Sequence, residues 1–398
     1  MAFPLTQEQR RVVENRDGEL LVSAAAGSGK TRVLVERLLD RVTREGRDID
    51  DFLVITYTRA AAAELRERVA QELTLRLAEH PNDRHLRRQT TLIYKAQIST
   101  IHAFCSLLLR ESGHMIGLDG DFRLCDDGEG AVLKRRVLGE VLDGQYEGLQ
   151  PESDFAALVD TMAAGRDDSA LEEIVLDVFE HVQSHPDPEQ WLLEQKAAWG
   201  FEGISDVGQT PWGSLLLEEA RRQVEHARKR LEQSLDLCNE DEMLYTNYGG
   251  SVTASIAGCD AFLQACERGW DEAAACLPVP FPAAGRKKGA DELLADRMKT
   301  LRDKAKKELL KVAEQLEGTS GQLLEDMKLT APAVRGLMDL VIAFQRAYGQ
   351  EKARRNLVDF SDLEHFAVRL LWDGRAGEFS PLAHYWSDKF AEVMVDEY

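Results

Sequence analysis

The sequence predicts an α/β protein in which a parallel sheet is joined to a large, wholly helical insertion. The first observation is a set of short apolar segments, at residues 20–23, 52–56, 97–100 and 393–395. Each is bounded by a polar or small residue, and the first three are followed by helical patterns. Strands that alternate with helices form parallel sheets, and ligands of such sheets bind beyond the carboxyl ends of the strands. In this sheet we expect residues 393–395 to lie beside residues 20–23.

The second observation concerns the middle of the chain. From about Asp126 onward, apolar residues recur at spacings of three and four, which is the pattern of amphipathic helices. We therefore predict one sheet domain in two parts, residues 1–118 and residues 355–398. A helical domain of residues 119–354 is expected to be inserted between them.

The composition is that of an ordinary globular protein. Apolar residues make up 44% and charged residues 30% of the 398 positions, and the formal net charge is −21. This charge argues against a general attraction to nucleic acid, although residues 285–311 carry an excess of basic side chains. That segment is either a solvated helix face or a DNA contact.

The sequence has no features of a membrane span or of a secretion signal. It contains no apolar run of about 18 residues, and its first residues lack the basic and apolar regions of a signal peptide. The six cysteines include no Cys-x-x-Cys pair, as is typical of reduced thiols in a cytosolic protein. We therefore expect a cytoplasmic protein without a membrane partner.

A stretch of small residues, AAAGSGKT at residues 24–31, lies between the first apolar segment and an amphipathic helix. Its spacing fits the phosphate-binding pattern G-x-x-x-x-G-K-[ST], except that alanine replaces the first glycine. Backbone N–H groups of such a loop surround an anion, the lysine adds a mobile charge, and the threonine hydroxyl suits Mg²⁺. The alternative is a turn that packs a helix on a sheet. We predict an ATP and Mg²⁺ site formed by Ala24, Ala26, Gly27, Ser28, Gly29, Lys30 and Thr31.

Gln9 lies upstream of this loop, in the stretch LTQEQ. A glutamine amide has one acceptor and two donors, which match the N6 amino group and N7 of adenine. By itself, Gln9 is more simply a surface residue. Its position ahead of the phosphate loop favours a role in selecting ATP over GTP.

The segments after the second and third apolar runs have features of a nucleic-acid contact. Tyr57 follows the second run, where its ring can stack on a base, and Thr58 is placed to cap the next helix and to hold a phosphate. Arg59 adds a positive charge for a phosphate contact. Thr100 likewise caps a helix, whose first turn contains His102. The alternatives are a simple capped helix with a packed tyrosine, and a histidine that packs at a helix end.

Two carboxylates follow the last apolar segment. Asp396 can hold Mg²⁺ through water, and Glu397 can act as the base or orient the water that attacks the γ-phosphate of ATP. Upstream, in the stretch VDFSDL, Ser361 and Glu364 are predicted to form a capping box for the helix that follows.

Six stretches occur together in one order: LTQEQ, AAAGSGKTR, TYTRAAAAELRERV, STIHAF, VDFSDL and VMVDEY. As a set they resemble the N-terminal half of a superfamily 1A DNA helicase of the UvrD/Rep type. The middle of the chain, with FRLCDDGEGAVLKRRVL, FAALVDTM and VQSHPDPEQWLLE, resembles the long helical insert of the AddA subunit of bacterial AddAB helicase–nucleases. The resemblance implies a RecA-like P-loop NTPase domain, motor domain 1A, whose two parts flank an all-helical domain 1B.

The same resemblance implies roles for individual residues. Gln9 corresponds to the adenine-reading glutamine, Arg32 to an arginine near the nucleotide base, and Tyr57 to the aromatic residue that pockets a DNA base. The residues that correspond to the phosphate, Mg²⁺ and catalytic groups are Lys30, Thr31, Asp396 and Glu397. The residues that correspond to further contacts with single-stranded DNA are Thr58, Thr100 and His102.

The resemblance also implies a function. It predicts an ATP-dependent DNA helicase subunit, with an exonuclease in the complete protein, which unwinds and processes double-strand DNA ends for recombinational repair. Its partners would be single- and double-stranded DNA ends and an AddB-type subunit. Because a second motor domain and a nuclease domain do not fit within the sequence, we expect a fragment that binds nucleotide but does not translocate. The alternatives are a solitary UvrD/Rep-type repair helicase with an enlarged insert, and a non-enzymatic nucleotide- or DNA-binding module.

Overall fold

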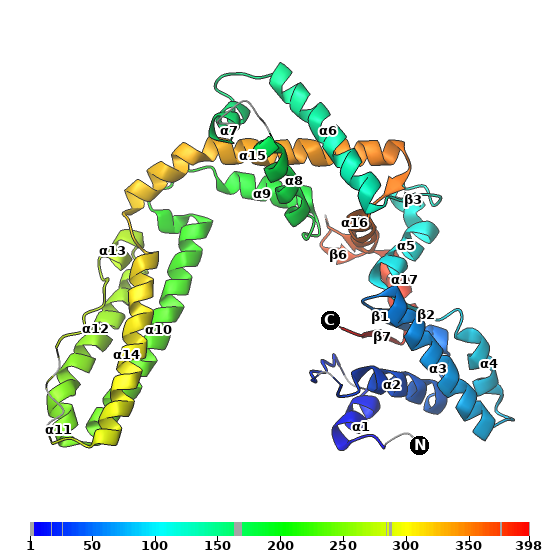
Figure 1. Cartoon of the computed structure of the whole chain (residues 1–398), viewed down its shortest axis with the longest axis horizontal. Coiled ribbons are helices and arrows are strands. Elements are labelled where there is room, and N and C mark those ends of the chain that lie inside the picture. The colour runs from blue at the N-terminus through cyan, green and yellow to red at the C-terminus, as the bar shows by residue number, and fades with distance from the viewer. Residues whose placement is uncertain are drawn as a thin grey trace. The chain divides into compact units, whose positions relative to one another are not determined.

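The computed structural model describes residues 4–16, 18–25, 27–162, 169–283, 285, 289–374 and 376–397 (Figure 1). The chain divides into two compact units: a sheet unit of Met1–Val137 with Arg346–Tyr398, and a helical unit of Leu138–Gln345. As predicted, helices predominate and the sheet is parallel. The division into domains of residues 1–118, 119–354 and 355–398 stays a prediction.

The central sheet has three parallel strands in the order β2–β1–β7, namely β1 (Phe52–Thr56), β2 (Gln97–Thr100) and β7 (Glu392–Val395). Every residue of β1 is buried, which explains why this strand is an almost continuous apolar run. The register pairs Thr56 with Thr100 and Ile55 with Val395. The carboxyl ends of the three strands therefore lie at one edge of the sheet.

The expectation that residues 20–23 form a strand beside residues 393–395 is wrong. Residues 19–25 are irregular, and β7 pairs with β1 instead. The side chain of Leu21 is 83% exposed, and Leu20 and Val22 are exposed as well. An apolar run forms a strand only where its N–H and C=O groups find a hydrogen-bonding ladder, and this run gains neither a ladder nor burial.

Helices cover both faces of the sheet. One buried cluster joins Val54 and Met394 to α2, α3 and α4, and another joins Leu53 and Ile55 to α5, α16 and α17. Because neighbouring residues of β1 point to opposite faces, the strand contributes to both clusters. The helices of the sheet unit are α1 (Gln7–Glu14), α2 (Lys30–Arg44), α3 (Arg59–Glu79), α4 (Arg84–Leu92), α5 (Ile101–Ser112), α16 (Phe360–Leu371) and α17 (Pro381–Lys389). Its short strand pairs are β3 (Arg123–Leu124) with β4 (Leu357–Val358), and β5 (Trp372–Asp373) with β6 (Glu378–Phe379).

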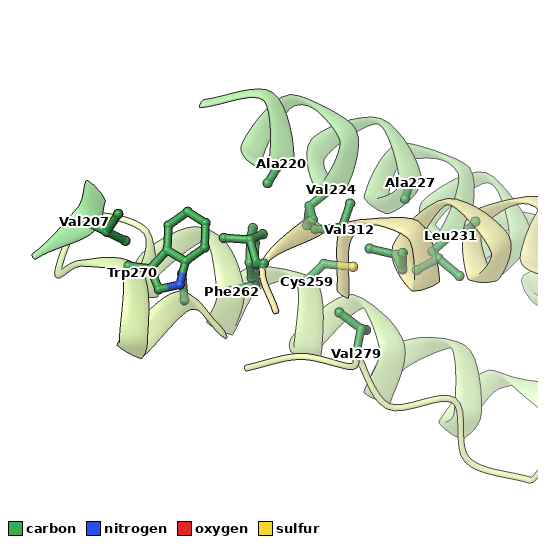
Figure 2. Close-up of a cluster of buried hydrophobic side chains, with 14 of the residues drawn as sticks. Val207, Ala220, Val224, Ala227, Leu231, Cys259, Phe262, Trp270, Val279 and Val312 are labelled. Carbon is green, nitrogen blue, oxygen red and sulfur yellow. The ribbon is translucent and has the colours of Figure 1, made fainter. Parts of the chain in front are cut away.

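The helical unit is built around α10, α12 and α14, which pack lengthwise (Figure 1). Buried residues recur along α10 at spacings of four, three and four: Ala220, Val224, Ala227 and Leu231. Figure 2 shows this stripe facing Phe262, Cys259 and Val312. The helices within this unit are α7 (Asp154–Met162), α8 (Ser169–Val182), α9 (Pro188–Ala198), α10 (Pro211–Asn239), α11 (Glu242–Leu244), α12 (Gly250–Ala265), α13 (Trp270–Ala274) and α14 (Glu292–Gln315). Two long helices, α6 (Asp127–Glu147) and α15 (Ser320–Arg354), include residues of both units.

The basic segment at residues 285–311 falls largely within α14. Residues 286–288 lie outside the described part of the chain. On α14, the guanidinium of Arg302 lies 5.2 Å from the centre of the Phe281 ring, and its Nη2 donates to the carbonyl of Pro282 at 3.1 Å. At least this cation of the segment therefore contributes to packing within the helical unit.

The capping box predicted at Ser361 and Glu364 is wrong by two residues. Helix α16 begins at Phe360, and the box is formed by Asp359 and Asp362, each of which accepts a hydrogen bond from the backbone N–H of the other. Lys352, which is buried, donates to Asp359 at 2.7 Å and to Asp362 at 2.5 Å. Burial alone would raise the pKa of Asp359, but Lys352 outweighs this effect and holds the pKa below its usual range. The buried cation thus contacts both members of the aspartate pair, which forms the box in place of the serine–glutamate pair.

Candidate functional site

Several of the residues predicted to be functional gather where the three parallel strands end. Tyr57 follows β1, His102 lies in the first turn after β2, and Asp396 follows β7. The backbone N–H of Asp396 donates to the carbonyl of Ile55 at 2.8 Å, which extends the pairing of β7 with β1. The segments predicted to carry chemistry therefore lie at one edge of the sheet, as expected for a parallel α/β fold.

The stretch at residues 24–31 forms a tight loop that leads into α2. Gly27 and Gly29 have φ angles of 77° and 87°, which glycine adopts at little cost. The Ser28 N–H donates to the Ala25 carbonyl at 3.2 Å, and the Lys30 ammonium group donates to the Ala24 carbonyl at 2.8 Å. Lys30 thus reaches back across the loop. Ala26 lies outside the described residues.

The N-terminus of α2 differs from those of α3 and α5. Thr58 caps α3 and Thr100 caps α5, as predicted, each by accepting a backbone hydrogen bond through its hydroxyl. By contrast, Gly29 occupies the cap position of α2, no side chain of the described residues caps it, and its first turn has no acidic residue. This terminus, which is the positive end of the helix dipole, is therefore suited to bind an anion.

Two side-chain oxygen atoms, from Thr31 in the first turn of α2 and from Asp396, lie close together. The Thr31 hydroxyl donates to Asp396 Oδ2 at 3.4 Å, and both residues line an open pocket of about 200 Å³ together with Tyr57 and Glu397. Glu397 has a φ of 65°, an uncommon value for a residue other than glycine. The described residues contain no cluster of three His, Cys, Asp or Glu side chains that could hold a metal by itself. A pair of oxygen ligands nevertheless fits Mg²⁺, which usually takes only one or two protein ligands together with phosphates and water.

Gln9 lies against the phosphate-type loop. Its amide nitrogen donates to the Ser28 carbonyl at 3.0 Å. The same nitrogen packs closely on Gly29, since a Cβ placed on that glycine would lie 3.4 Å from it. Thr6 and Gln9 form a capping box at the start of α1, which fixes the direction of the glutamine. The structure therefore brings the predicted base-reading residue to the loop. Arg32 lies in the first turn of α2 and is partly buried.

The predicted DNA contacts differ in how accessible they are. The side chain of Tyr57 is 80% exposed, and Thr58 and Arg59 beside it are exposed too. Thr100 is buried, and its hydroxyl oxygen accepts from the Ala103 N–H at 3.3 Å. Tyr57 and Arg59 can therefore meet a ligand directly, whereas Thr100 chiefly shapes the helix that carries His102.

His102 has partners that the sequence reasoning missed. Its Nε2 lies 3.0 Å from Glu364 Oε1, and the centres of the His102 and Phe360 rings lie 5.1 Å apart in an edge-to-face arrangement. Phe360 is exposed although it is the first residue of a helix whose buried face is formed by Leu363, Ala367 and Leu370. Phe360 lies three, seven and ten residues before Leu363, Ala367 and Leu370, so helical spacing places it near that buried face and the sequence gives no signal of its exposure.

Residues 5–398 match the sequence model of the UvrD/REP helicase N-terminal domain. The chain belongs to the UvrD/Rep helicase family. This confirms the resemblance drawn from the order of the short motifs.

The curated relatives include proteins named as the A subunit of an ATP-dependent helicase/nuclease. The chain is 38% identical to the protein of this name from Heliobacterium modesticaldum, over 99% of its own length and 30% of the relative's. It is 35% identical to that of Acetivibrio thermocellus and 36% identical to that of Pelotomaculum thermopropionicum, each over 99% of its length and 32% of theirs. The chain thus spans about a third of the length of these relatives.

Within the described residues, no helix combines the length and the apolar character that a bilayer crossing requires.

Proposed function

We propose that this UvrD/Rep-family chain forms the ATP-binding motor unit of an AddA-type helicase–nuclease. The observation that carries the proposal is the N-terminus of α2, which has no side-chain cap and whose Thr31 hydroxyl donates to Asp396 at 3.4 Å. A cradle of N–H groups beside two oxygen ligands fits a nucleotide phosphate and a divalent cation.

Each residue around the loop has a proposed task. Gln9 reads the adenine edge, with Arg32 near the base. The N–H groups of Ala24, Ala26, Gly27, Ser28 and Gly29 cradle the phosphates, and Lys30 directs its charge at the β- and γ-phosphates. Thr31 and Asp396 hold Mg²⁺, which when bound neutralises charge on the phosphate oxygens. Glu397, from the same pocket, accepts a proton from the attacking water or orients it.

The neighbouring strand ends are proposed to hold single-stranded DNA. Tyr57 is the base-stacking residue, because its ring is exposed beside the nucleotide pocket. Thr58, Arg59 and His102 lie on the same edge and are proposed to hold the strand through phosphate and sugar contacts. Thr100, which is buried, is proposed to support this contact by capping the helix that carries His102. Phe360 offers a second exposed ring next to His102.

The wider role is proposed from the names of the relatives, which combine a helicase with a nuclease and describe one subunit of an assembly. Combined with the family resemblance of the sequence motifs, these names support a proposed role in the cytoplasm, within a protein that unwinds and processes double-strand DNA ends for recombinational repair. An AddB-type subunit is its proposed partner, and the exonuclease belongs to the complete protein.

Tyr57→Ala is expected to weaken binding of single-stranded DNA by about 1–3 kcal/mol, because one base–aromatic stack contributes about that much. Fluorescence anisotropy of a labelled oligothymidylate, at one fixed salt concentration, measures the effect. Tyr94 provides a matched control, since it is 77% exposed and lies before β2, at the opposite edge of the sheet. Tyr94→Ala should leave the affinity unchanged. Equal affinities for both variants and the unaltered chain would show that Tyr57 is not a stacking residue.

A further inference from the structure

Helix α1, which carries Gln9, is short and buries little of its own surface. It is eight residues long, and Val13 is its only buried residue. Helices shorter than about 12 residues are marginal in water, since nucleation is costly and few hydrogen bonds repay it. The position of Gln9 therefore depends on contacts made elsewhere along α1.

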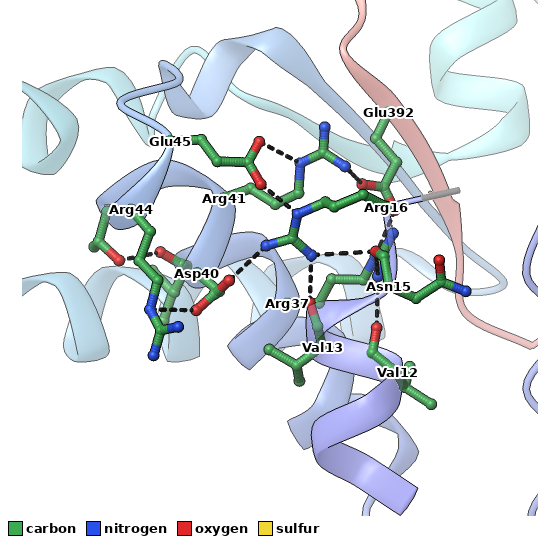
Figure 3. A network of polar contacts seen from close by, with 12 residues as sticks. Val12, Val13, Asn15, Arg16, Arg37, Asp40, Arg41, Arg44, Glu45 and Glu392 are labelled. Carbon is green, nitrogen blue, oxygen red and sulfur yellow. Dashed lines mark hydrogen bonds and ion pairs between the residues drawn. The ribbon is translucent and has the colours of Figure 1, made fainter. Parts of the chain in front are cut away.

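Arg37 of α2 supplies such contacts at the other end of α1. Its Nη1 donates to the carbonyls of Val12 at 2.5 Å and Asn15 at 2.6 Å (Figure 3). The last carbonyls of a helix have no partner within the helix and form the negative end of its dipole. A guanidinium group suits this position, because it stays charged and presents several donors in one rigid plane.

The same guanidinium also holds the strand that leads to Asp396. Arg37 Nε donates to Glu392 Oε1 at 2.6 Å, and Glu392 is the first residue of β7. Arg41, one turn further along α2, donates to the other oxygen of Glu392 at 2.7 Å. The side chains of Arg37 and Glu392 are 11% and 18% exposed, so solvent screens this ion pair only weakly.

Arg16 adds a second anchor for α1. Its Nη1 donates to the Val13 carbonyl at 2.6 Å, while its Nη2 pairs with Asp40 of α2, also at 2.6 Å (Figure 3). Burial lowers the pKa of Arg16, but the ion pairs with Asp40 and Glu45 outweigh it and raise the pKa. Arg16 does not contact β7 through either of these bonds. Among these described contacts, Arg37 is the group that touches both α1 and β7.

We propose that Arg37 is a positioning residue for base recognition. From α2, whose first turn carries Lys30 and Thr31, it fixes the helix that carries Gln9 and the strand that leads to Asp396. The inference rests on the proposed ATP site. The inference also goes beyond that site. It makes the choice between adenine and guanine depend on Arg37, a side chain eight positions past Gly29 that contacts no base.

The test compares two arginines of one helix that share one carboxylate. Arg37→Met removes the contacts with α1 and with Glu392. Arg41→Met removes a contact with the same carboxylate, but the other partners of Arg41 are Glu45, the residue that follows α2, and the ring of Phe52 in β1, so this variant leaves α1 untouched. Affinities for the fluorescent nucleotides mant-ADP and mant-GDP are measured with Mg²⁺ on the 398-residue chain. Thermal melting checks that each variant is folded.

The unaltered chain is expected to prefer mant-ADP over mant-GDP by about tenfold, as one correctly paired amide contributes about that much discrimination. Gln9→Ala and Arg37→Met should both remove the preference, and Arg41→Met should keep it. Arg37→Lys is the second variant, for the case in which the methionine variant does not fold. It keeps a charge beside Glu392 but cannot reproduce the fork of donors on α1, so the preference should fall here too.

Two failures are distinguishable. If the unaltered chain binds neither nucleotide, or binds both equally, the proposed adenine-reading site is wrong and the role of Arg37 is wrong with it. If the unaltered chain prefers mant-ADP through Gln9, while folded Arg37→Met or Arg37→Lys keeps the full preference, the role of Arg37 is overturned and the proposed site stands.

Discussion

Lys30→Ala is expected to weaken binding of ATP–Mg²⁺ by roughly ten- to a hundredfold, since a hydrogen bond to a charged group contributes about 1.5–3 kcal/mol. The ammonium group of Lys30 already reaches across the loop to the Ala24 carbonyl. A phosphate in the loop would offer it a stronger, charged acceptor. In a protein that turns over ATP, the same change should abolish hydrolysis, because the charge is aimed at the β- and γ-phosphates.

Isothermal titration calorimetry with ATP and Mg²⁺ measures the loss of affinity. Lys95 is a suitable control, because it is exposed and precedes β2, at the edge of the sheet opposite to the loop. Lys95→Ala should bind ATP like the unaltered chain. An affinity of Lys30→Ala within twofold of the unaltered value would rule out a phosphate role for this lysine.

The second large effect concerns turnover. The 398-residue chain, assayed alone with single-stranded DNA, is expected to hydrolyse ATP about 10³–10⁵-fold more slowly than a full-length relative, because loss of an opposing arginine costs about that factor in related phosphoryl-transfer enzymes. The family resemblance implies that these arginines come from a second motor domain. The chain spans about a third of the relatives' length and matches the N-terminal domain of the family.

A coupled assay for ADP release, with and without oligothymidylate, measures this difference. The full-length relative from Heliobacterium modesticaldum is a suitable comparison, since it is 38% identical to the chain. Its own variant at the position of Lys30 gives the background rate. DNA-stimulated hydrolysis by the 398-residue chain at a rate close to that of the relative would contradict the expectation that these residues are one half of a motor.

Features set by neighbouring residues could be predicted from the sequence. The caps at Thr58 and Thr100 are examples, because a hydroxyl that accepts from an N–H three residues later needs no distant partner. The apolar run of β1 was identified correctly for a related reason, since a strand covered on both faces has an almost unbroken apolar sequence.

Features that depend on distant partners were missed or predicted wrongly. Residues 20–23 have the composition of a strand, but pairing with another segment decides whether a strand forms. Asp359 and Ser361 both fit the short-range pattern of a helix cap, and Lys352, which contacts the residue that forms the cap, lies outside that pattern. The contacts of Arg37 with α1 and with Glu392 join residues from three separate elements. Spacing patterns along the chain do not contain such contacts.

The most direct test of the proposed ATP site is a crystal structure of the 398-residue chain with ADP and Mg²⁺. We predict that the nucleotide phosphates lie within hydrogen-bonding distance of the N–H groups at residues 27–31. We also predict that Mg²⁺ is bound by the Thr31 hydroxyl, with Asp396 beside it, and that the Gln9 amide contacts the adenine edge. A nucleotide bound at another place in the chain, with the first turn of α2 free of phosphate, would contradict the proposal.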